Sequence, residues 1–438
     1  MMRILPLMAF TVAAQTLPLS LPKAVELATA PNGNIRLQIA RETIAQAEAR
    51  RRIALGAFLP NLDGSVSASS QTRNLSAFGF RFPAGLPFTI PSFVGPFTVV
   101  DYRATASQSI LDLSAIQRYR AAKLQIEAAS ADVRNTLEIT VQQVARAYVQ
   151  VLRAEAALET ARANIDLAER LVQLAASQKR AGTGTGIEVT RGRVQLQNEM
   201  QRQLAAENDR DRAALELKHS IGMDLAQPIE VTDRMNDGTE PQPTTEAAIE
   251  AALNQRPDLI AQQKRQGAAQ LNVKSFASER LPTLGTSGDY GVIGDGSTML
   301  PTRSIGVGVR VPIFDGGRRE ARIAESGVLL RQERLRAEDI KKQIELEVRI
   351  ALNNLKSARS QIETARLGLE LSENELAQAQ RRSEAGVANS VELTDAQTRL
   401  TRARDNHLSA LYLFNLARID VAAASGSMHQ AVSGMVKR

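Results

Sequence analysis

A repeating pattern of apolar positions predicts two very long helices. Between residues 344 and 379, apolar or small side chains recur at steps of four and three, and the same pattern occurs 204 residues earlier, from 140 to 175. A heptad pattern kept over this length is typical of coiled-coil packing. One position of each pair is usually Ala, which lets the helix backbones approach closely. The first helix is predicted over residues 114–180, which spans about 100 Å at 1.5 Å per residue.

Alternation with a period of two predicts strands elsewhere in the chain. Residues 305–311 place Ile or Val at every second position, with Gly or Arg between them, and the expected partner lies over about 283–292. The earlier copy has strands over about 62–73 and 98–110. Each predicted strand has about 10–12 residues, the length of a tilted membrane β-strand.

The order of these features indicates a tandem duplication. Residues 181–190 align without a gap to 385–394, and 58–62 align to 280–284. The predicted organisation is a signal peptide at 1–14, helices at 15–61, a β-hairpin at 62–112, a helical hairpin at 113–222, a linker at 223–245, helices at 246–281, a β-hairpin at 282–313, a helical hairpin at 314–426 and a tail without regular structure at 427–438.

Four strands per chain are too few for a closed membrane sheet. Open strand edges are not tolerated in lipid, and a barrel needs at least about eight strands. We therefore expect an oligomer in which each chain adds four strands and the helical hairpins run side by side as a tube. The segment 76–97 holds six of the eleven Phe residues. It joins two predicted strands and is expected to form a loop at one mouth of the barrel.

Composition argues against several kinds of site. The 438 residues include no Cys and three widely separated His, and no P-loop, GxSxG or HExxH motif occurs. We expect no catalytic site, no metal and no cofactor. The net charge is +7, but basic and acidic residues are interspersed, which favours a solvated helical surface over a nucleic-acid interface. At the N-terminus, Arg3 precedes an apolar stretch, and cleavage of a signal peptide is expected after Ala14.

Several segments resemble the outer membrane factor (TolC-like) family of efflux and type I secretion channels. Residues 309–318, VRVPIFDGGR, are similar to its strand-to-helix signature, and 256–259 (RPDL) with 281–284 (LPTL) are similar to another family segment. The resemblance implies a mainly α fold with a membrane β-barrel part: a homotrimer with a twelve-stranded barrel in the outer membrane and twelve long helices in a periplasmic tunnel. It also implies a passive exit duct, not an enzyme, that works with a periplasmic adaptor protein and an inner-membrane pump.

The resemblance also implies two kinds of functional site. The turns between the long helices would dock the adaptor, or would serve only as turns. Their residues are Gly182, Thr183, Gly184, Gly386, Val387 and Ala388. Glu392 and Asp395 share a helix face and would form acidic rings at the periplasmic gate, or would be ordinary acids at a helix start. The second copy is the better gate candidate, because Arg191 stands near the position equivalent to Asp395.

A soluble periplasmic coiled-coil scaffold, or an adaptor protein, is the alternative. Adaptors also carry long helical hairpins, but they need small β-domains flanking one hairpin. Here each of two hairpins follows a pair of membrane-length strands. The sequence does not decide whether the transported substrate is a drug, a metal or a protein.

Overall fold

The computed structural model describes residues 16–79, 92–235, 238, 244–385, 387, 390–432 and 436–437. The predicted signal peptide, Gly386 and Ala388 lie outside these residues. The chain forms two compact units. The first unit comprises residues up to 43 together with 130–261 and 338–438, and the second comprises 44–129 and 262–337.

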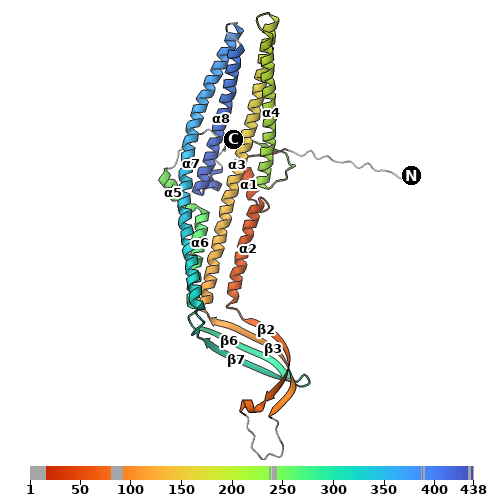
Figure 1. Cartoon of the computed structure of the whole chain (residues 1–438), viewed down its shortest axis with the longest axis vertical. Helices are drawn as coiled ribbons and strands as arrows, with labels where there is room; N and C mark the ends of the chain where they lie inside the picture. Colours follow the sequence, from red (N-terminus) through yellow and green to blue (C-terminus); the bar gives the residue numbers. More distant parts are fainter. Residues whose placement is uncertain are drawn as a thin grey trace, which may run out of the picture. The chain divides into compact units, whose positions relative to one another are not determined.

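Two helical hairpins dominate the first unit (Figure 1). Helix α3 (Leu113–Arg180) is followed by α4 (Gly186–Ile221), and α7 (Arg318–Glu384) is followed by α8 (Ser390–Ser425). Helices α3 and α7 begin in the second unit and continue into the first. Helix α1 (Leu21–Thr29) packs against α4, and α5 (Thr245–Gln255) packs against α8. Among the described residues, no helix is both long and apolar enough to cross a membrane.

The heptad positions form the packed seams of these helices. The two copies bury equivalent side chains at an offset of 204 residues, such as Val144 with Val348 and Ala154 with Ala358. Alternation of a large residue with Ala gives each helix a ridge and a shallow groove. The duplicated sequence pattern therefore becomes duplicated packing.

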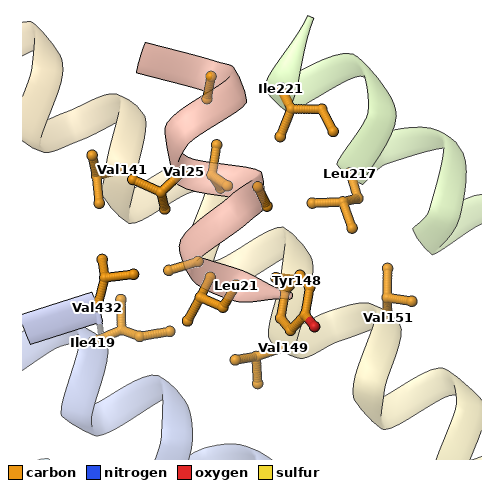
Figure 2. Close-up of a cluster of buried hydrophobic side chains, with 14 of the residues drawn as sticks. Leu21, Val25, Val141, Tyr148, Val149, Val151, Leu217, Ile221, Ile419 and Val432 are labelled. Carbon is orange, nitrogen blue, oxygen red and sulfur yellow. The ribbon is translucent and has the colours of Figure 1, made fainter. Parts of the chain in front are cut away.

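Helices α1, α3, α4 and α8 share one apolar core around Tyr148 in the first unit (Figure 2). The Tyr148 hydroxyl lies 2.8 Å from the Asp233 carboxylate and 2.8 Å from the Leu19 carbonyl oxygen. The same Asp233 oxygen accepts a hydrogen bond from the Leu21 backbone N–H at 2.7 Å. Burial raises the pKa of the Tyr148 phenol, so the hydroxyl stays protonated. A buried polar triad thus fastens the start of α1 to the segment before α5.

Two short pairings correct the expectation for the segments 223–245 and 427–438. Strand β1 (Leu17–Leu19) pairs in parallel with β4 (Ile229–Val231), and β5 (Arg234–Met235) pairs antiparallel with β8 (Val436–Lys437). The tail also contains α9 (Met428–Ala431). It is therefore not without regular structure, and the segment 223–245 is more than a linker. Strands of two or three residues carry no readable alternation, which is why the sequence did not predict them.

The second unit contains one antiparallel sheet of four strands in the order β2-β3-β6-β7 (Figure 1). The strands are β2 (Asn61–Asn74), β3 (Phe93–Leu111), β6 (Thr283–Gly294) and β7 (Met299–Arg310). The β-hairpins β2–β3 and β6–β7 are the two copies of the predicted strand pair, joined through β3 and β6. The short η1 (Leu75–Phe78) follows β2, while α2 (Ile35–Gly56) and α6 (Pro257–Ser278) precede β2 and β6 in the chain.

The predicted Phe-rich loop is shorter than expected. Strand β3 begins at Phe93, so Phe93 and Phe97 belong to the strand and pair with β2. Phe78 ends η1, and Phe80, Phe82 and Phe88 lie outside the described residues. The Pro and Gly between these aromatics obscured the alternation that defines the strand.

The register gives the sheet two unlike faces. Tyr102 stands opposite Val66 on β2 and Val292 on β6, so these side chains share one apolar face. On the other face, Arg103 pairs with Asp101 at 3.2 Å and with Asp289. Residues that are directly opposite in a ladder lie on the same side of the sheet. One face therefore suits an apolar medium and the other suits water.

Candidate channel entrance: the helical tips and the acidic pair

The tip between α3 and α4 is closed by a glycine turn. Gly182 has φ +71°, a left-handed conformation that side chains disfavour. The N–H groups of Thr183 and Gly184 both donate to the Gln178 carbonyl oxygen, at 3.0 and 3.1 Å. A left-handed residue just past a helix end, with hydrogen bonds back into the last turn, is a common helix stop. Backbone hydrogen bonds therefore stabilise the reversal of the chain at this tip.

The start of α4 is fixed by an acid. The Glu188 carboxylate accepts a hydrogen bond from the Thr185 backbone N–H at 2.7 Å, satisfying a donor that the helix leaves free. Gly184 lies close to this acid, since a Cβ there would come within 3.1 Å of the Glu188 carboxylate and 3.0 Å of the Gln178 Cβ. Glycine is therefore favoured at 182 by its left-handed conformation, and a side chain at 184 would require its neighbours to shift by a few tenths of an ångström.

The tip between α7 and α8 repeats one backbone hydrogen bond of the first tip. The Val387 N–H donates to the Arg382 carbonyl oxygen at 2.9 Å. These two residues are the counterparts of Thr183 and Gln178 at an offset of 204. The Val387 side chain is 70% exposed. Thr183 and Val387 are therefore exposed at equivalent positions of the two tips.

Glu392 and Asp395 lie in the first turns of α8, and both are exposed. The structure adds a residue that sequence reasoning missed, because the Arg382 Nε donates to the Glu392 carboxylate at 2.9 Å. Arg382 belongs to the last turn of α7, where a cation is favoured by the helix dipole. Comparison of the two copies offered a signal for it, because the counterpart of Arg382 is the neutral Gln178.

The two tips are held next to each other within the first unit. The Gln178 side-chain amide donates to the Ser383 carbonyl oxygen at 3.3 Å. An apolar cluster behind the tips joins α3, α7 and α8 through Leu167, Leu376, Ala379, Leu393, Ala396 and Leu400. Glu375 on α7 and Arg399 on α8 form an ion pair at 2.7 Å. The helices are therefore packed against one another directly behind the tips.

The side chains at the two tips are suited to contacting another protein and to interacting with ions. Across the part of the chain that the structure describes, no three His, Asp or Glu side chains gather in a way that could hold a metal. Glu188 is partnered by a backbone N–H, and the exposed Glu392 is partnered by an arginine. The arrangement can dock a protein surface and can attract or repel ions.

A family model described as outer membrane efflux protein matches residues 28–223 and 248–427. This chain belongs to that family. The two matched segments each cover one copy of the duplicated unit. The chain is an outer-membrane channel of the efflux and secretion type, and the family match supports this reading over the alternative of a soluble scaffold or adaptor.

Named relatives agree with this assignment. The outer membrane efflux protein BepC of Brucella suis is 24% identical over 349 residues, which cover 76% of this chain and 75% of BepC. The pyoverdine export outer membrane protein OpmQ of Pseudomonas aeruginosa is 28% identical over 327 residues, covering 72% of this chain and 66% of OpmQ. Neither name describes an enzyme.

A solved structure shows the same fold. The outer membrane channel CmeC of Campylobacter jejuni superposes with a TM-score of 0.76 at 19% sequence identity, covering 95% of this chain and 89% of CmeC. Agreement over nearly the whole of both chains confirms the mainly helical architecture with long hairpins and a four-stranded sheet.

Proposed function

We propose that three copies of this chain form one passive exit duct, with a shared twelve-stranded barrel in the outer membrane and a periplasmic tunnel of long helices. A periplasmic adaptor and an inner-membrane pump would deliver the substrate and supply the energy. The chain itself would perform no chemistry. The observation that carries this proposal is the open, two-faced sheet.

The outer strands of the sheet support a shared barrel. Within the described residues, β2 and β7 each pair on one side only. Neighbouring strands alternate in direction, so β7 of one chain can pair antiparallel with β2 of the next. An unpaired strand edge in lipid leaves backbone groups without hydrogen bonds, at a cost of several kcal/mol per group. Closure between chains removes both edges.

The two faces of the sheet support insertion in a membrane. Ile305 is 88% exposed in the single chain, and Val307 and Val309 of the same strand are also exposed. Such a row of apolar side chains is unfavourable in water and favourable against lipid. The opposite face, with Asp101, Arg103 and Asp289, would line a water-filled lumen. The sheet thus has the polarity that a membrane channel requires.

The tips and the acidic pair would form the periplasmic entrance. The exposed residues Thr183 and Val387, at equivalent positions of the two tips, would offer two similar docking positions per chain for an adaptor. Rings of Glu392 and Asp395 around the axis would concentrate negative charge and favour cations. Arg382 would be the internal counter-charge of this gate, because it already partners Glu392.

Intermolecular crosslinking tests the barrel directly, and the chain helps because it has no native Cys. A Cys in β2 and a Cys in β7 lie three strand spacings apart within one chain, about 14 Å, which is too far for a disulfide. Scanning Val66→Cys against single Cys substitutions along β7 should give covalent trimers at one register. The matched control, Val66→Cys with Tyr102→Cys, should crosslink within a chain, because these residues are directly opposite.

The mass of the purified oligomer and its ion conductance provide two further tests of the shared barrel. Detergent-purified protein should have three times the 47.5 kDa of one chain, with the detergent subtracted, and should conduct ions in a planar bilayer. Monomers without conductance, together with the absence of any β2–β7 crosslink between chains along the whole scan, would contradict the shared barrel.

A further inference from the structure

The helix segments that adjoin the strands carry a surplus of positive charge. They hold eleven Lys and Arg against six Asp and Glu, so they account for five of the chain's seven net positive charges. These segments are residues 48–56, 111–125, 272–283 and 312–325. The described residues at the strand ends far from the helices, 69–79, 92–101 and 291–302, hold one Arg and two Asp. The charge is therefore asymmetric along the strand direction.

Only part of this basic surplus is neutralised by nearby acids. Arg280 pairs with Glu320, and Arg322 pairs with Glu279 at 2.7 Å. A second set of basic residues lies near the end of α2 and the start of α3, and we refer to it as the junction patch. It consists of Arg50, Arg51, Arg52, Arg120 and Lys123. In the described part of the chain, no carboxylate forms an ion pair with any of these five side chains.

One aromatic contact joins the end of α2 to the start of α3, the two helices that carry the junction patch. Phe58, just after α2, packs edge-to-face on Tyr119 of α3, with ring centroids 6.2 Å apart. The Lys123 ammonium lies 5.0 Å from the centroid of the Tyr119 ring. The buried Arg51 Nε has no hydrogen-bond acceptor among the described atoms. The junction patch therefore includes a nitrogen donor without a described acceptor, and the Tyr119 ring positions the Lys123 ammonium.

Exposed apolar side chains occur beside these basic segments. Ile53, one helical turn after Arg50, is 75% exposed, while Ile313 and Phe314, just after β7, are 92% and 85% exposed. Apolar and aromatic groups followed by Arg and Lys are typical of the boundary between lipid tails and phosphate headgroups. Neither a nucleic acid nor an acidic protein surface accounts for the apolar part of this pattern.

We propose that the junction patch binds the anionic headgroups of phospholipids in the leaflet that meets the helical end of the strands. This inference rests on the proposed insertion of the strands in the membrane. Guanidinium and ammonium groups donate charge-assisted hydrogen bonds to phosphate oxygens, and a basic cluster next to a membrane attracts anionic lipid. The patch would fix the depth of the barrel in the bilayer.

The test compares phosphatidylglycerol with phosphatidylcholine on the full-length, detergent-purified channel. Phosphatidylglycerol should raise the melting temperature by several degrees and remain bound in native mass spectrometry, and phosphatidylcholine should do neither. The variant Arg50→Gln, Arg52→Gln, Arg120→Gln, Lys123→Gln should lose most of this shift and most of the bound lipid. Raising the salt concentration should weaken the wild-type effect, because exposed charges are screened.

A matched control removes four exposed positive charges from α7, away from the strands. It carries Arg331→Gln, Arg334→Gln, Lys341→Gln and Lys342→Gln and should keep the wild-type response to phosphatidylglycerol. The proposal would be overturned if the patch variant responded to phosphatidylglycerol as strongly as the wild type does. It would also be overturned if the control variant lost as much of the response as the patch variant. Stabilisation by inorganic phosphate alone would overturn it too, because it would indicate a simple anion site.

The oligomer mass and the bilayer current are read on the same samples. If the patch variant remains an oligomeric, conducting channel and responds equally to both lipids, the lipid site is supported independently of the barrel. If the wild type is monomeric and non-conducting, the proposed function itself fails.

Discussion

The tip between α3 and α4 and the tip between α7 and α8 carry equivalent acids but differ in the charge beside them. In the first tip, Glu188 accepts from a backbone N–H. In the second, its counterpart Glu392 accepts from Arg382, where the first copy has Gln178. The duplication therefore kept the acid and one backbone hydrogen bond of the tip but changed the charge beside the acid, so the two halves of one chain are not electrically equivalent.

The same contrast recurs in the helical packing. Tyr148 of α3 corresponds to Leu352 of α7, and Glu199 of α4 corresponds to Ala403 of α8. The first copy has buried polar groups where the second has apolar ones. Positions that set helix spacing were retained, whereas positions that carry polarity diverged. Substitutions that exchange residues between the copies test this interpretation.

The largest effect is expected for Tyr148→Leu, which gives the first copy the residue of the second. It removes a buried ring and one partner of Asp233, and we expect a loss of about 2–4 kcal/mol in the free energy of unfolding. Tyr148→Phe should cost about 1–3 kcal/mol, because it removes only the hydroxyl. Thermal melting by far-UV circular dichroism measures both. Losses no greater than that of Leu352→Met, a volume-conserving control, would argue against the polar triad.

Gly182→Val comes next. A β-branched side chain at φ +71° should cost about 1–2 kcal/mol, and fraying should be confined to the tip. Hydrogen exchange over residues 178–188 should accelerate, while exchange in the apolar core does not. Gly368→Ala is the control, since a Cβ there meets nothing within 4 Å and α7 continues through it. Unchanged exchange at the tip would show that the turn does not need a left-handed residue.

Smaller effects on stability are expected at the gate, where the readout is ion selectivity. Arg382→Gln copies the first tip into the second. It should change stability by less than about 1 kcal/mol, because the Arg382–Glu392 pair is exposed, but it should increase cation preference in a planar bilayer.

The opposite change should reverse the selectivity. The double variant Glu392→Ala, Asp395→Ala should reduce cation preference, and Glu188→Ala should leave it close to that of the wild type. Identical single-channel currents in all three variants would remove the acidic pair from the gate.

The smallest effect concerns Glu199, which is fully buried. Burial raises the pKa of its carboxyl, Asp405 raises it further, and Arg202 and Gln195 oppose the shift. Because the folded pKa lies above the unfolded value, the folded protein holds the proton more tightly, so stability falls as pH rises through the folded pKa. Glu199→Gln should therefore melt at a higher temperature than the wild type at neutral pH.

The difference should disappear below the ordinary glutamate pKa of 4.5, where both states of the wild type are protonated. Glu373→Gln, at an exposed position of α7, should show no such pH-dependent difference. A Glu199→Gln variant that parallels the wild type at every pH would mean that the buried carboxyl is compensated by its neighbours.

Local periodicity predicted the long helices and the four strands well. A heptad or a two-residue alternation is repeated many times along one segment, so the face that it buries is fixed before any tertiary contact forms. The sequence also located the turns at 182–184, because glycines interrupt an otherwise continuous helical pattern. Their role in docking stays a prediction.

Contacts between residues that only the tertiary fold brings together could not be predicted from the sequence. Arg382 and Glu392 are ten residues apart, and only the path of the turn between them places their side chains together. Tyr148 and Asp233 are brought together by tertiary packing alone, and the pairing of β1 with β4 involves three residues on each side. None of these contacts has a periodic signature, and each depends on where a whole element stops.

The incomplete sheet has a consequence for inheritance. In the proposed assembly each chain depends on two siblings to close its edges, so a chain with a damaged β2 or β7 disables the intact chains that it joins. A cell that expresses both a normal and an edge-defective copy of the gene should lose a larger fraction of its channels than the fraction of defective chains. Such alleles should behave as dominant, whereas alleles that prevent synthesis of the chain should behave as recessive.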